Sequence, residues 1–401
     1  MKGMLALCLT FVLGAGPMLQ AGADEEGPVM SGFPLELFQE VAKEHPDANV
    51  LVSPFSVKTA LTMTYNGAAG DTRKDMGKVL GFGELGSVEA VAAREQLVLN
   101  SLRQPGMSTQ LEIANALFGE KSVAFKPDFV SLNKQYFGAE INSLDFKSPD
   151  AVKTINLWVS EKTHEKIPTI IDQVSEDAIL YLINAIYFKG AWQHKFDKAL
   201  TKPGDFHLPN GSTKKVPMMH LSRDDFRYYE TGDFKIISLP YADGRLSMYV
   251  ILPGKTTSLS AFEASLTPQM WVDLVNRVHK SDGRLVLPRF KLEDKMTLKE
   301  VLCRMGLEVA FDQNKADFSE MSDLKQRVYI SQVFHKTFME VNEEGTEAAA
   351  ATAVEMAPTM AMANPPPPFE MIVDRPFVIA LRDNKTDSLL FMGHVVEPPG
   401  Q

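Results

Sequence analysis

Cysteine is nearly absent from this chain of 401 residues, which contains only Cys8 and Cys303. We expect Cys8 to be removed with a leader segment, so the mature chain should have no intramolecular disulfide. Cys303 has apolar neighbours, which favour a buried structural cysteine over a catalytic thiol. The fold must therefore be held together by its core alone. A chain of this length with 45% hydrophobic residues is large enough for that.

Long basic runs are also missing. The formal net charge is −10, and the nearest thing to a basic cluster is the pair Lys214-Lys215. A nucleic-acid groove or a polybasic membrane patch needs more positive charge than this. We therefore expect no nucleic-acid partner and no membrane partner. A heparin-like polyanion is disfavoured for the same reason, although folding can assemble a patch from distant residues.

Only one apolar stretch stands at the start of the chain, over residues 4–13, and it is too short for a comfortable membrane span. Lys2 precedes this stretch, and the small residues Ala21-Gly22-Ala23 follow it. This pattern is typical of a secretory signal peptide cleaved after Ala23. The alternative is a buried N-terminal helix. We predict a signal peptide at 1–23 and a secreted, soluble domain at 24–401, extracellular, or periplasmic in a bacterium.

The signatures of common enzymes are absent. There is no Gly-x-Ser-x-Gly nucleophile elbow, no phosphate-binding loop and no dinucleotide fingerprint. His164-Glu165 begins a zinc-protease pattern, but Pro168 occupies the position of the second histidine. Ser322 and Lys325 match Ser-x-x-Lys without its companion motifs. We predict that the protein is not an enzyme and has neither a cofactor nor a metal.

Periodicity predicts helices in the first half of the chain and strands towards its end. Apolar residues at helical spacing indicate helices over 35–42, 56–65, 151–163 and 298–305, the second beginning near Ser53-Pro54. Runs rich in branched and aromatic residues indicate strands over 178–187, 246–252, 328–341, 373–381 and 389–396. This order favours an α+β fold with segregated layers.

One segment differs from the rest of the chain. Residues 343–353 read EEGTEAAAATA, small and apolar residues continue to Ala363, and Asn364 is followed by four prolines. A disordered linker could have this composition. However, strand-like sequence lies on both sides of the segment, and a loop this long within a compact domain is usually functional.

The same segment has the alternation of a strand. Because successive side chains in a strand point to opposite faces, one face would carry Thr346, Thr352 and small or apolar residues without charge. The other face would carry Glu347 and Glu355. This pattern predicts a strand with one buried and one solvated face. Alanine and threonine are small enough to slip between strands that are already packed.

Several motifs together resemble the serpin family. Residues 343–352 look like the hinge of inhibitory serpins, and 49–56 (NVLVSPFS) like an early helix of the family. Residues 182–192 (LINAIYFKGAW) are similar to its central-sheet strand, and 373–379 with 391–393 to its C-terminal signature. The matches run in order from about residue 33 to 397. The resemblance implies an α+β serpin fold, with helices around three β-sheets and an exposed reactive-centre loop at about 343–368.

The resemblance also implies a mechanism. A protease cleaves the loop and forms an acyl-enzyme, and the freed hinge then inserts into the central sheet with the protease attached. The protease is the implied partner, bound covalently to a monomeric inhibitor. By analogy the cleaved bond is Thr359-Met360, fourteen residues after the hinge glycine. The stretch from there to Pro376 is longer than usual for the family.

The resemblance assigns further residues to three groups. The hinge group comprises Glu343, Gly345, Thr346, Glu347, Ala348, Ala349, Ala350, Ala351 and Thr352. The polar cluster beneath the central sheet, where its strands part, comprises Ser53, Ser56, Asn184 and His335. The top of the sheet has Trp192, and Arg289 is the expected partner of Glu343 at the base of the loop, a pair that would matter little if it were exposed. Apart from the resemblance, these residues are equally explained as satisfied buried polar groups and a core tryptophan.

No Lys or Arg lies between Val341 and Asp374, so a trypsin-like target is disfavoured. An elastase-, subtilisin- or chymotrypsin-like protease fits better. Two alternatives stay open: an inhibitor of a cysteine protease, and a serpin-fold protein that binds a ligand without inhibiting. The small hinge residues favour inhibition.

Overall fold

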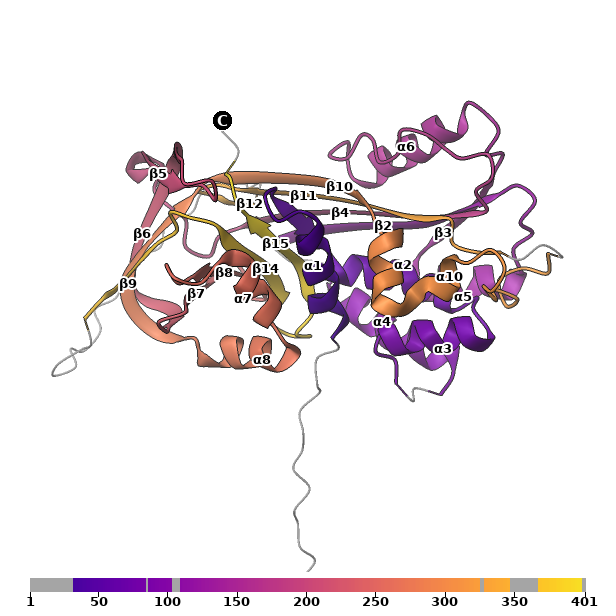
Figure 1. Cartoon of the computed structure of the whole chain (residues 1–401), viewed down its shortest axis with the longest axis horizontal. Helices are drawn as coiled ribbons and strands as arrows, with labels where there is room; N and C mark the ends of the chain where they lie inside the picture. Colours follow the sequence, from indigo (N-terminus) through magenta and orange to yellow (C-terminus); the bar gives the residue numbers. More distant parts are fainter. Residues whose placement is uncertain (1–31, 84–85, 103–108, 325–327, 347–366, 399–401) are drawn as a thin grey trace, which may run out of the picture.

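The computed structural model describes residues 32–83, 86–102, 109–324, 328–346 and 367–398. A six-stranded central sheet crosses the molecule with the order β10-β11-β12-β4-β2-β3 (Figure 1). Strands β11 and β4 are parallel neighbours, whereas β10–β11 and β2–β4 are antiparallel. The bounds are β2 Thr109–Glu120, β3 Glu140–Leu144, β4 Leu180–Ala191, β10 Phe290–Thr297, β11 Gln332–Val341 and β12 Gly345–Thr346.

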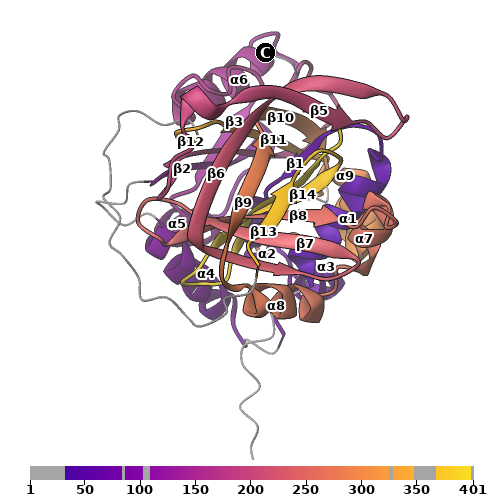
Figure 2. The ribbon, with the colours of Figure 1, turned by 90° about the vertical axis from the view of Figure 1, so that its left-hand side faces the viewer.

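The second sheet has nine strands in the order β1-β15-β14-β8-β7-β6-β9-β13, with β5 beside β6. The long strand β6 breaks register between Arg223 and Phe226, which divides this sheet into two parts. The resemblance implied three sheets, whereas the described strands form two, because β6 runs through both parts of the larger sheet. Figure 2 shows β6 and β9 side by side. The bounds are β1 Val50–Val52, β5 Lys202–His207, β6 Thr213–Glu230, β7 Phe234–Pro240, β8 Leu246–Pro253, β9 His279–Pro288, β13 Phe369–Ile372, β14 Phe377–Asp383 and β15 Leu389–Val395.

Helices cover both faces of the central sheet, with α6 on one side and α2 on the other (Figure 1). The apolar run of β4 is buried along nearly its whole length because both faces are covered. The helices are α1 Phe33–Glu44, α2 Pro54–Tyr65, α3 Gly70–Val79, α4 Val88–Leu102, α5 Pro127–Phe137, α6 Ala151–Lys162, α7 Leu259–Ser265, α8 Pro268–Arg277, α9 Lys299–Leu302 and α10 Glu308–Phe311. A 3₁₀ turn at Lys198–Leu200 and a wide turn at Cys303–Leu307 complete the described elements.

The predicted start of α2 is confirmed. The Ser53 hydroxyl accepts a hydrogen bond from the Ser56 N–H, and Pro54 occupies the first turn, where its missing N–H costs nothing. The helices predicted at 35–42 and 151–163 are also present as α1 and α6. The helix predicted at 298–305 is present as α9 and the π-helical turn Cys303–Leu307 that directly follows it. The chain then widens and passes Gly306, whose φ of +100° interrupts the helix.

The predicted strands are present with shifted ends. Strand β11 begins at Gln332 rather than at 328, and the strand predicted from 373 begins at Phe377, after Pro376. Helices α7–α10 also lie between late strands, so the two kinds of element are less segregated along the chain than we expected. Cys303 is half-buried and free, and burial raises its thiol pKa. The predicted signal peptide lies outside the described residues, and no described helix is long and apolar enough to cross a membrane.

Candidate functional site

The start of the hinge already occupies the central sheet. Strands β11 and β4 pair directly from Gln332/Tyr181 to Phe338/Tyr187. Above that point they separate, and β12 lies between them. Thr346 pairs with Val341 on one side and with Gly190 on the other, antiparallel to both strands. The chain therefore begins a new strand here, of which the structure describes Gly345 and Thr346.

The first position of β12 requires glycine, and Gly345 occupies it. Its φ is +148°, a conformation that other residues rarely adopt. An added Cβ would stand 2.1 Å from the carbonyl oxygen of Gly190 and 2.6 Å from the Cα of Ala191. Since both are backbone atoms of β4, neither can rotate away. Glycine thus lets the hinge backbone approach β4 closely.

Thr346 is completely buried, and its hydroxyl lies 2.8 Å from the Tyr241 hydroxyl. Tyr241 is itself fully buried, and burial raises its pKa. Each hydroxyl is the hydrogen-bond partner of the other at a position shielded from solvent. Thr346 belongs to the face of the hinge that we expected to be uncharged, and this face contacts a polar partner that suits threonine.

Trp192 binds two backbone carbonyls of the segment that precedes β12. Its indole N–H donates to the carbonyl of Asn342 at 2.9 Å, and its backbone N–H donates to the carbonyl of Glu344 at 2.9 Å. The indole also stacks on Tyr241 with ring centroids 4.5 Å apart. Trp192 is therefore more than a core tryptophan, because it fixes the backbone at the point where the loop enters the sheet.

Two carboxylates anchor the base of the loop. Glu343 accepts from Arg289 at 2.5 Å and from the Thr201 hydroxyl at 2.7 Å. Only 2% of the Glu343 side chain is exposed, so its pair with Arg289 is not the exposed kind of pair that contributes little. Burial raises the pKa of Glu343, but these hydrogen bonds outweigh it and hold the pKa below its usual range.

The neighbouring Glu344 lies nearer the surface. It forms ion pairs with Lys195 at 2.8 Å and Lys198 at 3.0 Å, which hold its pKa low. The two glutamates just before β12 are thus held by cations.

The predicted polar cluster exists beneath the sheet. His335 Nε2 accepts from the Ser53 N–H at 3.0 Å, and the Asn184 amide donates to the Ser56 hydroxyl at 2.5 Å. All four residues are fully buried. Asn184 and His335 are direct register partners on β4 and β11. The strands are therefore closed at this level and are separated only above Phe338. Their parting at this cluster stays a prediction for the inserted state.

The His335 imidazole and the Asn184 side-chain amide both affect the energy of opening the sheet between β4 and β11. Burial lowers the pKa of His335 to about 3, so the imidazole is neutral at physiological pH. Asn184 also donates to Asn115 on β2. Among the described residues, however, none donates a hydrogen bond to the buried Asn184 Oδ1. An unpaired buried carbonyl of this kind costs free energy that a new donor would recover.

The structure brings together Glu343, Gly345, Thr346, Trp192 and Arg289 at the top of the sheet. The other predicted hinge and bond residues lie outside the described residues: Glu347, Ala348, Ala349, Ala350, Ala351, Thr352, Thr359 and Met360. Sequence reasoning missed Tyr241, Asn342, Thr201, Lys195 and Lys198. They stand far from the hinge in sequence or in ordinary local contexts, and no local signal marks them.

Chemically, the site is a gap between two strands that holds the first residues of a small, uncharged segment. Within the part of the chain that the structure describes, no group of three His, Cys, Asp or Glu side chains could hold a metal ion. The arrangement suits the addition of a strand.

The comparisons agree with this architecture. The family model described as "Serpin (serine protease inhibitor)" matches residues 29–398, and the chain belongs to the serpin family. Mouse leukocyte elastase inhibitor A is 38% identical over 377 residues, which cover 91% of this chain and 97% of that protein.

Solved structures show the same fold. Tengpin, a thermophilic serpin in its native state, aligns with a TM-score of 0.82 and 32% identity, covering 96% of this chain and 97% of that chain. Human thyroxine-binding globulin in complex with its hormone aligns with a TM-score of 0.83 and 27% identity, covering 92% and 97%.

Proposed function

We propose that this serpin traps a serine protease of elastase-like, subtilisin-like or chymotrypsin-like specificity by loop cleavage, acyl-enzyme formation and strand insertion. The observation that carries the proposal is the two-residue strand β12, seated between β11 and β4. Insertion needs no new starting point, because the first residues are already paired. It requires only that the seven direct β11–β4 residue pairs below β12 separate.

The register of β12 predicts where the following residues would go. Counting along both antiparallel ladders from Thr346, Thr352 would arrive opposite Asn184 and His335. Its side chain would point to the same face as Thr346, towards the polar cluster. The Thr352 hydroxyl would then be placed to donate to the Asn184 Oδ1 that otherwise lacks a donor among the described residues. Satisfying this carbonyl is one source of the free energy that insertion releases.

Our expectation for the other face of the inserted strand has to be revised. We expected that face to be solvated, but α6 covers this side of the sheet, with Ile155 and Val159 packed near Ile183 and Ala185. By the same count, Ala351 would lie beside Ala185 and Ala353 beside Ile183. In the inserted strand, alanines would therefore face α6, and their small side chains suit a position beneath a packed helix.

The length of the sheet supports the assignment of the reactive bond. Continuing the count, Glu355 would reach Gln332 and Tyr181, and Met356 would reach Leu180 at the far end of β4. Thr359 lies just beyond that end, about 45 Å from Thr346 in an extended strand. A protease attached there would be carried from one end of the sheet to the other. Displacing its serine from the oxyanion hole would prevent deacylation.

The choice of target follows from the loop and from a relative. The absence of Lys and Arg between Val341 and Asp374 disfavours a trypsin-like pocket. A relative 38% identical to this chain is named as an inhibitor of leukocyte elastase. A cysteine protease is the second candidate target. A ligand-binding role without inhibition is disfavoured because Gly345 and Thr346 fit the sheet without strain.

Further expectations belong to the same proposal. The inhibitor acts as a monomer, forms its partner complex covalently and turns over no substrate of its own. It is secreted after removal of residues 1–23, an expectation that rests on the leader pattern alone.

The test is incubation of the purified protein with elastase-, subtilisin- and chymotrypsin-like proteases and with papain-like proteases. We expect a complex that survives SDS with at least one serine protease, with mass spectrometry placing the cut near Thr359. Cleavage of the loop by every protease without any stable complex would contradict the proposal.

A further inference from the structure

Two Asn-x-Ser/Thr sequons occur in the chain, Asn210-Gly211-Ser212 and Asn384-Lys385-Thr386. In a secreted protein such a tripeptide is the acceptor of an N-linked oligosaccharide. The first lies in the turn between β5 and β6, and the second lies in the turn between β14 and β15. By sequence alone the second is the better acceptor, because threonine is ordinarily more effective than serine in this position. The fold, however, gives the two side-chain nitrogens different surroundings.

The turn that contains Asn210 faces solvent. Residues 209–213 are all exposed. The Leu208 carbonyl accepts from the Gly211 N–H at 2.9 Å, and the Leu208 N–H donates to the Ser212 carbonyl at 2.8 Å, so the turn has a defined shape. Gly211 has a φ of +82°, and an added Cβ there would meet no atom within 4 Å. An oligosaccharide attached to this turn would extend into solvent.

The Asn210 side chain uses only its oxygen for hydrogen bonding. Asn210 Oδ1 accepts from the Ser212 N–H at 2.9 Å and from the Ser212 hydroxyl at 2.7 Å. Within the part of the chain that the structure describes, no group accepts a hydrogen bond from Asn210 Nδ2. The atom that would bond to the sugar therefore contributes nothing to the fold.

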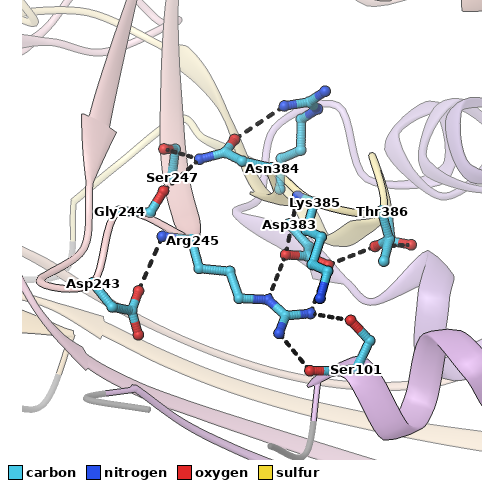
Figure 3. Close-up of polar contacts among 11 residues, drawn as sticks. Ser101, Asp243, Gly244, Arg245, Ser247, Asp383, Asn384, Lys385 and Thr386 are labelled. Carbon is cyan, nitrogen blue, oxygen red and sulfur yellow. Dashed lines mark hydrogen bonds and ion pairs between the residues drawn. The ribbon is translucent and has the colours of Figure 1, made fainter.

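The Asn384 side chain is in the opposite situation. Although the residue is exposed, its Nδ2 donates to the Gly244 carbonyl at 3.0 Å and to the Ser247 hydroxyl at 2.8 Å. Figure 3 shows this amide pointing towards Gly244 and Ser247, on the neighbouring β7–β8 hairpin. Both hydrogens of the nitrogen are thus in use. A sugar on Asn384 Nδ2 would replace one of them and would have to fit between two hairpins that are in contact.

The hydroxyl of the second sequon is also engaged. Thr386 donates to Asp383 Oδ2 at 2.6 Å, and Asp383 is completely buried and paired with Arg245 at 2.9 Å. Figure 3 shows that Arg245 also reaches Ser101, at the end of α4, whose hydroxyl it contacts at 2.6 Å. Withdrawing Thr386 from this network would leave a buried carboxylate with one donor fewer, which costs stability.

We propose that Asn210 carries an N-linked oligosaccharide in the secreted protein and that Asn384 does not. Asn210 Nδ2 forms a bond to the anomeric carbon of a lipid-pyrophosphate-linked oligosaccharide. The bond from that carbon to the pyrophosphate oxygen breaks, the lipid pyrophosphate leaves with the electron pair, and the nitrogen loses one proton to a base of the transferring enzyme. The assignment rests on the proposed secretion of the protein, because this donor is met only on the export route.

The fold selects between the two sequons through folding itself. An unfolded chain exposes both asparagines to the transferring enzyme. A sugar on Asn210 leaves every described hydrogen bond of the turn intact, whereas a sugar on Asn384 removes a bond to Gly244 or Ser247. Chains modified at Asn384 therefore fold incompletely and stay in the cell, while chains modified at Asn210 reach the medium.

The test is production of the full-length chain in cultured mammalian cells, once with its own leader and once with an established cleavable leader placed before Asp24. Peptide-N-glycosidase in heavy-oxygen water converts each occupied asparagine into a labelled aspartate, which mass spectrometry locates. In protein from the medium we expect the label at Asn210 and none at Asn384. The variants N210Q and S212A should lose the whole glycan mass. The matched control N314Q changes an exposed asparagine outside any sequon and should keep it.

Three results would overturn the assignment: an unoccupied Asn210, sugar on Asn384 in protein from the medium, or an unchanged glycan mass in S212A. Chains retained in the cell give a second check, because any sugar on Asn384 should be confined to them. The two leaders separate this site from the proposed secretion. If only the established leader delivers the protein to the medium, and Asn210 is then occupied, the secretion expected from residues 1–23 is wrong and the site assignment holds.

Discussion

Thr346→Arg places a cation where the loop enters the central sheet. Thr346 is 0% exposed, is paired on both sides and contacts the Tyr241 hydroxyl. A guanidinium at this position would lose its water and gain only a phenol as a polar partner. The hinge would then leave the sheet to keep the charge hydrated.

The magnitude follows from two opposing contributions. Burying an unpaired charge costs several kcal/mol even after the protein relaxes. The backbone hydrogen bonds of one inserted residue return only about 1 kcal/mol each. A net barrier of about 3 kcal/mol slows insertion about a hundredfold, since 1.36 kcal/mol corresponds to tenfold in rate. Deacylation of the protease then precedes trapping in most encounters.

The assay compares the trapped complex with the cleaved inhibitor on SDS gels, using a protease that the parent traps. Thr346→Arg should yield cleaved inhibitor almost exclusively. Two controls separate charge from size. Thr346→Ser keeps the hydroxyl and should behave like the parent, whereas Thr346→Met is long but neutral and should be intermediate. If the arginine variant traps as efficiently as the serine variant, insertion does not begin at Thr346 and the mechanism is wrong.

Three further predictions follow from the same geometry. Thr352→Val should lower the yield of trapped complex about fivefold by removing one hydrogen bond worth about 1 kcal/mol, while Thr352→Ser should not; equal yields for both variants would contradict the counted register. The pKa of His335, about 3 in the folded chain, lies below its ordinary value of 6.5, so the unfolded chain takes up the proton first. Stability should therefore fall as the pH drops from about 6.5 towards 3, by about 1.4 kcal/mol per pH unit, and melting curves of His335→Gln should lack this part of the pH dependence. Cleavage near Thr359 should raise the melting temperature strongly in calorimetry, because the freed strand completes the sheet, and an unchanged value would favour a non-inhibitory protein.

The motifs of the chain were sufficient to predict much of this protein. The Ser53-Pro54 start of α2, the apolar run of β4 and the small residues after Gly345 each act between neighbours in sequence, through capping, burial and strand alternation. These local effects predicted an α+β fold and a hinge segment with one small, uncharged face. The need for glycine at position 345 also follows from the family's pattern.

Other features depended on residues that meet only in the folded chain. Tyr241 satisfies Thr346, and Lys195 and Lys198 hold Glu344, although nothing in their own sequence surroundings indicates it. The register that pairs Asn184 with His335 depends on how two strands about 150 residues apart align. The cover of α6 over the outer face arises in the same way. Periodicity tells which face of a strand is buried, but only the packed sheet determines which residues share that face and where the strands separate.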